Sequence, residues 1–111
     1  MSATLSTHVL DIARGVPAAG IEIVLYAIDG ERRTVVTRTV TDDDGRTGAL
    51  ASGLHSGMYE LVFAVAAYFG GTATPSLFDT IPVRFRIDEH NERYHVPLLL
   101  SPWGYSTYRG S

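Results

Sequence analysis

The chain has 111 residues, no cysteine, and a formal net charge of −3 from 9 basic and 12 acidic residues. This length suits one hydrophobic core, so we expect a single domain over residues 1–111. The weak negative charge argues against nucleic acid and membrane surfaces as partners, and the lack of cysteine excludes disulfides, thiolate metal sites and cysteine nucleophiles.

The start of the chain has no basic segment followed by an apolar run, so we expect no secretory signal and a cytoplasmic location. The longest weakly polar stretch, residues 61–69, is far shorter than a bilayer-spanning segment. We therefore expect a soluble protein with no membrane partner.

The first predicted strand covers residues 6–10, where polar and apolar side chains alternate. The alternation places Thr7 and Val9 on one face, and the other face consists of Ser6, His8 and Leu10. His8 thus lies in the middle of a strand, where a polar side chain needs either a partner or a function.

Alternating or β-branched residues predict further strands along the chain, separated by turn signals such as Asp29-Gly30. These strands cover residues 21–27, 34–40, 58–63, 81–87 and a final pair within 94–111 that turns at 101–104. Residues 48–54 are expected to form a loop, and residues 88–92 a turn. The strand over 81–87 is placed near a sheet edge by its proline.

One short helix is predicted over residues 65–69, which are rich in alanine and end at Gly70-Gly71. We expect no other helix. About seven or eight short strands with regular turn signals are typical of a two-sheet β-sandwich, so the predicted fold class is all-β.

The segment Asp42-Asp43-Asp44-Gly45-Arg46 is an acidic turn that resembles a calcium loop only superficially. An EF-hand would need acidic ligands where the chain has Val40 and Ala51, so we predict no calcium site. From spacing alone, Arg46 is a surface charge that pairs with Asp43 or Asp44.

The four histidines show no zinc-binding spacing, and His55 and His90 fall in predicted loops, where we expect exposed side chains. His8 and His95 lie within predicted strands. The residue pattern leaves two interpretations open for them, a structural histidine with satisfied hydrogen bonds or a functional one.

The final stretch, residues 94–111, is more apolar and aromatic than most chain ends. It is either an ordered terminal strand or part of a site. In an isolated sandwich, Trp103, Tyr105 and Tyr108 would be exposed.

The chain contains three distinctive motifs. They are Leu5-Ser6-Thr7-His8-Val9-Leu10-Asp11, Asp44-Gly45-Arg46, and His95-Val96-Pro97-Leu98-Leu99-Leu100-Ser101-Pro102 followed by Tyr108-Arg109-Gly110-Ser111. Together they resemble the motifs of the 5-hydroxyisourate hydrolases, the transthyretin-related enzymes of urate breakdown. The resemblance covers residues 5–111. It implies a transthyretin-like sandwich that hydrolyses 5-hydroxyisourate to 2-oxo-4-hydroxy-4-carboxy-5-ureidoimidazoline.

The resemblance also implies the roles of individual residues. His8 and His95 would activate water and pass its proton, with no order assigned between them because coupled groups share their titration. Arg46 would bind ring oxygens and offset developing negative charge. The substrate-binding residues would be Tyr108, Arg109, Gly110 and Ser111, with Gly110 giving the tail freedom to bend.

Family members are tetramers with sites between subunits, so the resemblance further implies a homotetramer whose small-molecule substrate binds at the subunit interface. The residues show neither a cofactor-binding loop nor a zinc motif, so we expect no cofactor and no metal. The alternative is a non-catalytic transthyretin-like carrier of a small aromatic ligand. In the vertebrate carrier, lysine, glutamate and threonine replace the three isolated site positions and the Tyr-Arg-Gly-Ser ending is lost. Retention of His8, Arg46 and His95 favours the enzyme.

Overall fold

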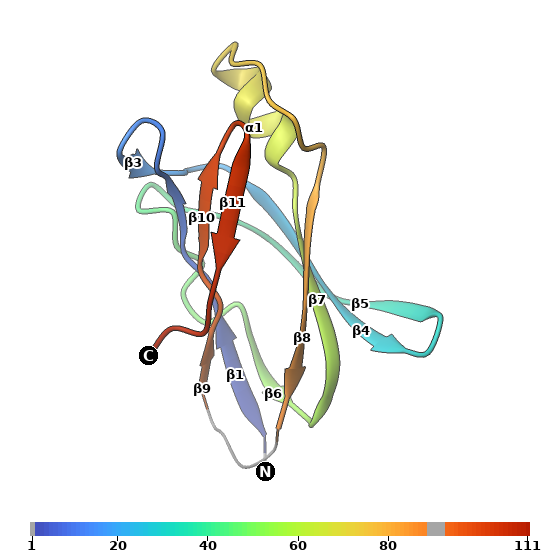
Figure 1. Cartoon of the computed structure of the whole chain (residues 1–111). Helices are drawn as coiled ribbons and strands as arrows, with labels where there is room; N and C mark the ends of the chain where they lie inside the picture. The colour runs from blue at the N-terminus through green and yellow to red at the C-terminus, as the bar shows by residue number, and fades with distance from the viewer. Residues whose placement is uncertain (1, 89–92) are drawn as a thin grey trace.

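The computed structural model describes residues 2–88 and 93–111, which form eleven strands and one helix arranged as a sandwich of two layers (Figure 1). The predicted all-β fold class is confirmed. One layer is an antiparallel sheet with the strand order β5-β4-β7-β8. In that order its strands are Arg32–Val40, Glu22–Asp29, Gly57–Phe63 and Ile81–Ile87.

The second layer is divided into two sheets, with strand orders β6-β1-β9 and β11-β10-β2-β3. The first contains Ala51–Leu54, Ala3–Ser6 and Arg93–His95. The second contains Gly104–Thr107, Leu98–Ser101, Val9–Asp11 and Val16–Pro17. The described residues form more strands than the predicted seven or eight, partly because two long strands are each interrupted.

Both interruptions lie at the same level of the layer. β1 gives way to β2 at Thr7-His8, and β9 gives way to β10 at Val96-Pro97. The two segments run parallel to each other, so the breaks lie side by side. Pro97 has no backbone N–H to donate to a ladder, which is one physical reason for the break.

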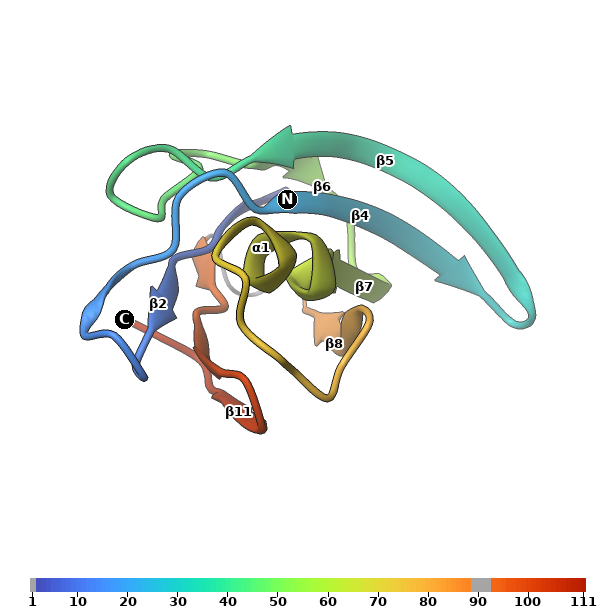
Figure 2. The ribbon, with the colours of Figure 1, turned by 90° about the horizontal axis from the view of Figure 1, so that it is seen from above.

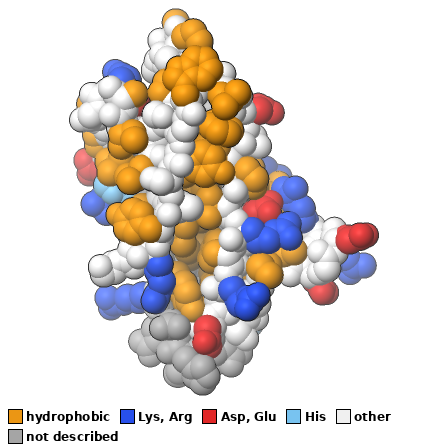
Figure 3. Space-filling view, in the orientation of Figure 1, with side chains coloured by type: hydrophobic (Ala, Val, Ile, Leu, Met, Phe, Trp, Pro, Cys, Tyr) orange, Lys and Arg blue, Asp and Glu red, His pale blue; other side chains and the backbone are white. Residues whose placement is uncertain are grey.

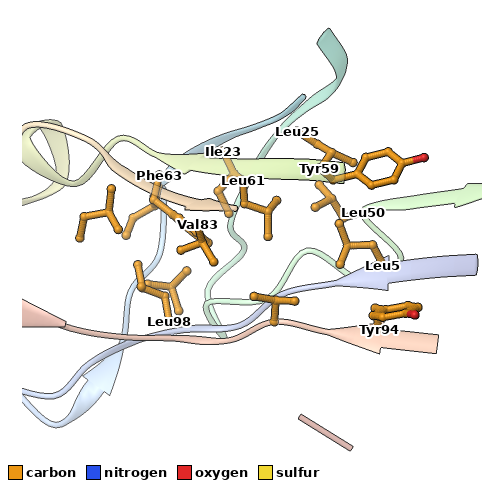
Figure 4. Packing of buried hydrophobic residues seen from close by; sticks show 14 of the residues in the cluster. Leu5, Ile23, Leu25, Leu50, Tyr59, Leu61, Phe63, Val83, Tyr94 and Leu98 are labelled. Atoms are coloured by element: carbon orange, nitrogen blue, oxygen red, sulfur yellow. The ribbon is translucent and has the colours of Figure 1, made fainter. Parts of the chain in front are cut away.

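The core lies between the layers and follows the predicted alternation (Figure 4). Ile23 and Leu25 of β4 meet Leu61 and Phe63 of β7, all fully buried. Each such side chain contributes about 1.5–3 kcal/mol through burial. Thr7 and Val9, which the alternation of residues 6–10 places on one face, are also buried.

Helix α1, Val65–Gly71, lies at one end of the sandwich (Figure 1). It is the only helix among the described residues, as predicted, and it continues through Gly70 and Gly71 rather than ending before them. Val65 and Phe69 are buried, and the Tyr68 hydroxyl donates a 2.8 Å hydrogen bond to the buried carboxylate of Asp11. Burial and this hydrogen bond raise the pKa of Tyr68. The helix is thereby fixed to the end of β2.

Three further predictions about strands and loops have different outcomes. The loop expected over residues 48–54 was partly wrong, because its second half forms β6, which pairs with β1 along the edge of the layer. β8 is an edge strand, as its proline predicts. The predicted turn at 88–92 lies outside the described residues except for Asp88.

The surface has two distinctive parts. The β4–β5 hairpin projects away from the body of the molecule (Figure 2). Hydrophobic side chains gather on the face that carries β10, β11 and α1 (Figure 3). As expected for an isolated sandwich, Trp103, Tyr105 and Tyr108 are exposed, at 66%, 40% and 56%.

Candidate active site

A cleft of about 670 Å³ opens beside the two strand interruptions. Residues from four separate parts of the sequence line it, and the final residue is among them. They include Ser6, Thr7, Arg46, His95, Gly110 and Ser111. Such convergence of polar side chains on one hollow is the usual character of a small-molecule site.

His95 is the last residue of β9 and is half-buried in this cleft. Its Nδ1 lies 2.8 Å from the hydroxyl oxygen of Ser6, the residue opposite it in the parallel β1–β9 pairing. The Thr7 hydroxyl donates a 2.6 Å hydrogen bond to the Val96 carbonyl, which fixes the backbone just beyond His95. The imidazole is therefore positioned by the contact of Nδ1 with Ser6 and by the fixed backbone of the segment that carries it.

The surroundings of His95 favour the neutral imidazole. Burial lowers its pKa below the ordinary value, and the charges of Arg46 and His8 lower it further, while a hydrogen bond with the Ser6 backbone acts in the opposite direction. A neutral imidazole can accept a proton from water at neutral pH. His95 thus has the protonation state that a general base requires.

His8 lies between β1 and β2, and its ring points to the acidic turn. Its Nε2 donates a 2.9 Å hydrogen bond to the Asp44 carbonyl, because a carbonyl oxygen can only accept. The His8 backbone also forms an isolated antiparallel bridge with Arg46. His8 does not line the cleft itself, although its charge acts on His95.

The acidic turn delivers Arg46 to the cleft. The Asp42 carboxylate accepts 2.9 Å hydrogen bonds from the backbone N–H groups of Asp44 and Arg46, so the turn closes on its own side chain. Gly45 has a φ of +73°, and a Cβ there would collide with the Val9 carbonyl. A glycine is therefore needed on both grounds.

The expected surface pairing of Arg46 does not form. Of the residues that the structure describes, neither Asp43 nor Asp44 makes an ion pair with Arg46. The guanidinium is exposed and lines the cleft instead. It is available to a bound anion or to an electron-rich carbonyl oxygen.

The chain end folds back against His95. The Gly110 N–H donates a 2.7 Å hydrogen bond to the His95 carbonyl, and Ser111 reaches the cleft. The predicted reason for a glycine was wrong, because Gly110 does not have a positive φ. A Cβ at Gly110 would lie 2.5 Å from Cδ2 of His95, so the glycine is needed for close approach to the imidazole.

Tyr108 and Arg109 lie outside the cleft of this single chain. The Arg109 guanidinium stacks 5.0 Å from the centre of the Tyr94 ring, and its Nη2 donates a 3.2 Å hydrogen bond to the Arg93 carbonyl. Arg109 therefore fixes the tail to β9. The structure thus brings Arg46, His95, Gly110 and Ser111 together and leaves His8 beside them.

Sequence reasoning missed several lining residues, namely Thr4, Ser6, Thr7 and Arg93. A signal existed for Ser6, because the alternation places it on the same face as His8. His55 is exposed as predicted, and His90 lies outside the described residues. Within residues 2–88 and 93–111, no three His, Asp or Glu side chains are grouped to hold a metal ion, and no helix is long and apolar enough to cross a membrane.

Comparison with known proteins places this chain in a family. The family model described as the HIUase/Transthyretin family matches residues 5–110, nearly the whole chain. The chain belongs to the HIUase/Transthyretin family. The predicted resemblance is confirmed.

Within this family, the chain is 50% identical to the 5-hydroxyisourate hydrolase of Deinococcus radiodurans, with 96% of this chain and 95% of that protein covered. The solved structure of the Klebsiella pneumoniae 5-hydroxyisourate hydrolase is 37% identical and matches with a TM-score of 0.85, covering 98% and 94% of the two chains. The solved (S)-allantoin synthase is 42% identical with a TM-score of 0.89. The alignment covers 99% of this chain but only 44% of that longer one.

Proposed function

We propose that this chain hydrolyses 5-hydroxyisourate to 2-oxo-4-hydroxy-4-carboxy-5-ureidoimidazoline, a step of urate degradation. The observation that carries the proposal is the meeting of His95, Arg46 and the chain end in one cleft. The 50% identity to a 5-hydroxyisourate hydrolase over nearly the full length of both chains supports it.

The reaction opens a cyclic amide by addition of water. The water oxygen forms a bond to the amide carbonyl carbon, the carbon–nitrogen bond then breaks, and the ring nitrogen takes up a proton. The product therefore carries a new carboxylate and a ureido group. Catalysis requires a base for the water, stabilisation of the developing oxyanion and a proton for the leaving nitrogen.

His95 and His8 supply the proton transfers in this proposal. The lowered pKa of His95 keeps its imidazole neutral and able to accept the proton of the attacking water. His8 lies beside it across the strand break, where the charges of the two rings interact. A proton held by the pair can then pass to the leaving nitrogen.

Arg46 stabilises the negative charge in this proposal. Its side chain is free of the acidic turn that positions its backbone. A planar guanidinium can offer two parallel N–H groups to the oxygens of the substrate. Gly110 and Ser111 close the cleft around the bound ring.

Assembly as a homotetramer, with sites at the subunit interface, forms part of the proposal. Leu77, Trp103 and Tyr105 are exposed at 63%, 66% and 40%. Hydrophobic side chains gather on the face that carries β10, β11 and α1 (Figure 3). Burial against a second copy would remove this area from water. Tyr108 and Arg109, which lie outside the cleft of one chain, would then reach substrate through the assembly. A cytoplasmic location stays a prediction.

The carrier alternative is not favoured. A carrier needs no base beside its ligand, whereas this cleft holds an imidazole whose pKa is lowered and a guanidinium without an acidic partner among the described residues. Comparison of the loss of 5-hydroxyisourate absorbance with and without the protein separates the two. The substrate must be freshly generated, and the uncatalysed decay is subtracted. Acceleration that disappears in His95→Ala supports the enzyme, and no acceleration by the wild-type protein overturns it.

A further inference from the structure

Ser6 makes a direct contact with the imidazole of His95 that the proposed chemistry does not use. Its hydroxyl oxygen lies 2.8 Å from Nδ1 across 89 residues of sequence. Ser6 is the last residue of β1 and His95 the last residue of β9, and the two are register partners. The contact therefore lies where the paired strands break.

We propose that Ser6 is a positioning residue that holds the proton of neutral His95 on Nδ1 and leaves Nε2 as the basic nitrogen facing water. This inference rests on the proposed role of His95. In a neutral imidazole only one nitrogen carries a proton, and the hydrogen bond made by one nitrogen decides which.

The backbone of Ser6 is fixed beside His95, and the contact of its hydroxyl with Nδ1 leaves one nitrogen for the proposed chemistry. The carbonyl of Ser6 accepts a 3.0 Å hydrogen bond from the Val96 N–H, which holds it against the His95 segment. The Ser6 hydroxyl occupies Nδ1, so the proposed base function of His95 falls to Nε2, which must then be unprotonated. In the neutral ring the proton therefore lies on Nδ1, and the Ser6 hydroxyl oxygen accepts it.

The opposite edge of the ring is held by the chain end. Cδ2 of His95 faces Gly110 closely enough that a Cβ there would lie 2.5 Å away. Ser6 at Nδ1 and Gly110 at Cδ2 together fix the plane of the imidazole. Rotation of the ring by half a turn would bring Cδ2 to Ser6 and lose the hydrogen bond. Nε2 is the remaining nitrogen.

The tautomer is measured directly by the ¹⁵N signals of labelled histidine. His95 is assigned by its loss in His95→Ala. At neutral pH we expect the wild-type ring to show a protonated Nδ1 and a free Nε2. Ser6→Ala should shift the ring toward the mixture of tautomers seen in free imidazole. It should also lower kcat by about tenfold to a hundredfold, the scale for removing an outer hydrogen bond from a functional histidine.

Two further variants make the test specific. Ser6→Thr keeps the hydroxyl and should restore most of the Nδ1-protonated signal. Ser52→Ala removes an exposed serine from β6 in the same sheet, away from the cleft, and should leave both signal and rate unchanged. If Ser6→Ala does not fold, the wild-type and Ser6→Thr spectra still decide the question.

Two outcomes would overturn the inference. One is a wild-type His95 protonated on Nε2, which would mean that the Ser6 hydroxyl donates to Nδ1. The other is a Ser6→Ala protein with an unchanged tautomer, whatever its rate. Failure of the proposed function looks different, because the wild-type protein would then not accelerate the loss of 5-hydroxyisourate, while the tautomer of the wild-type ring could still depend on Ser6.

Discussion

The two layers of the sandwich use their strands differently. In the β5-β4-β7-β8 sheet, β7 pairs with β8 from Gly57 opposite Ile87 to Phe63 opposite Ile81 without a break. Its inward side chains form the core. The other layer is interrupted at Thr7-His8 and at Val96-Pro97.

The interrupted layer satisfies its backbone with different partners. The Val9 N–H donates to the Gly45 carbonyl of the acidic turn, and the Leu98 N–H donates to the His8 carbonyl. The histidines of the proposed site lie at these breaks. The comparison indicates that the continuous sheet supplies stability, and that the interrupted layer frees side chains and a turn for chemistry.

The largest effect is expected where the strands break. His95→Ala, and separately His8→Ala, should lower turnover by at least about a hundredfold, the scale for a positioned proton-transfer group. The sandwich should stay folded, because both side chains are only half-buried. Steady-state kinetics and circular dichroism check the two claims. Full activity in either variant would remove that residue from the mechanism.

Substitutions of Arg46 test whether its guanidinium acts through the geometry of its N–H groups or only through its positive charge. Arg46→Ala should lower turnover by about a hundredfold, as for loss of an oxyanion-stabilising donor. Arg46→Lys should recover only part of this loss, because an ammonium cannot reproduce two parallel N–H groups. The comparison is made at equal concentrations of folded protein. Equal rates for the wild type and Arg46→Lys would contradict the proposed contact.

The chain end tests whether the tail belongs to the site. Deleting residues 108–111, or adding a polar tag after Ser111, should lower turnover by about a hundredfold, since misplacement by about 1 Å can cost that much. The thermal midpoint should change little, because the tail side chains are largely exposed. An N-terminal tag is the control and should be milder.

Adding one methyl group at Gly110 makes the same test more specific. Gly110→Ala places a Cβ against the imidazole of His95 and should displace either the tail or the ring. Gly70→Ala, where a Cβ meets nothing within 4 Å, is the matched control. A tagged enzyme and a Gly110→Ala enzyme with unchanged turnover would together show that the ending is only structural.

The pH dependence should show a smaller effect. The folded-state pKa of His95 lies below its unfolded value, so the unfolded chain binds the proton first as pH falls. Stability from this group is complete above the unfolded pKa of about 6.5 and is lost as pH falls toward the folded one. The apparent pKa of the acid limb of the kcat/KM profile should likewise lie below about 6.5. In His8→Ala the apparent pKa of this limb should rise, because the charge of His8 no longer lowers the pKa of His95. A wild-type limb above about 6.5 would contradict the lowered pKa.

A core substitution in the β5-β4-β7-β8 sheet should change stability but not turnover. Leu61→Ala removes a fully buried side chain from β7 and should lower the free energy of unfolding by about 2–5 kcal/mol. Turnover per folded molecule should not change. Denaturant unfolding and active-site-normalised kinetics measure the two. A large loss of turnover would show that the two layers are not separable.

The sequence by itself determined which side chains share a face of a strand. Period-two alternation is a local property, so Thr7 and Val9 could be placed on one face of their strand, and Ile23 in a core strand, from neighbouring residues alone. The one predicted helix was likewise identified from the composition of a short segment. The family motifs identified His8, Arg46 and His95, because those residues stand within short recognisable segments. The sequence pattern did not show which residues of these distant segments contact one another.

Only the tertiary structure decided how the site is assembled. Ser6 meets His95 across 89 residues, and no periodicity relates the two positions. The need for glycine at position 110 comes from the imidazole opposite it rather than from its own φ. Tyr108 and Arg109 belong to the same motif as Ser111, yet they turn away from the cleft of the single chain. Local sequence fixes the direction of a side chain relative to its own strand, whereas the identity of its neighbour depends on how distant strands pair.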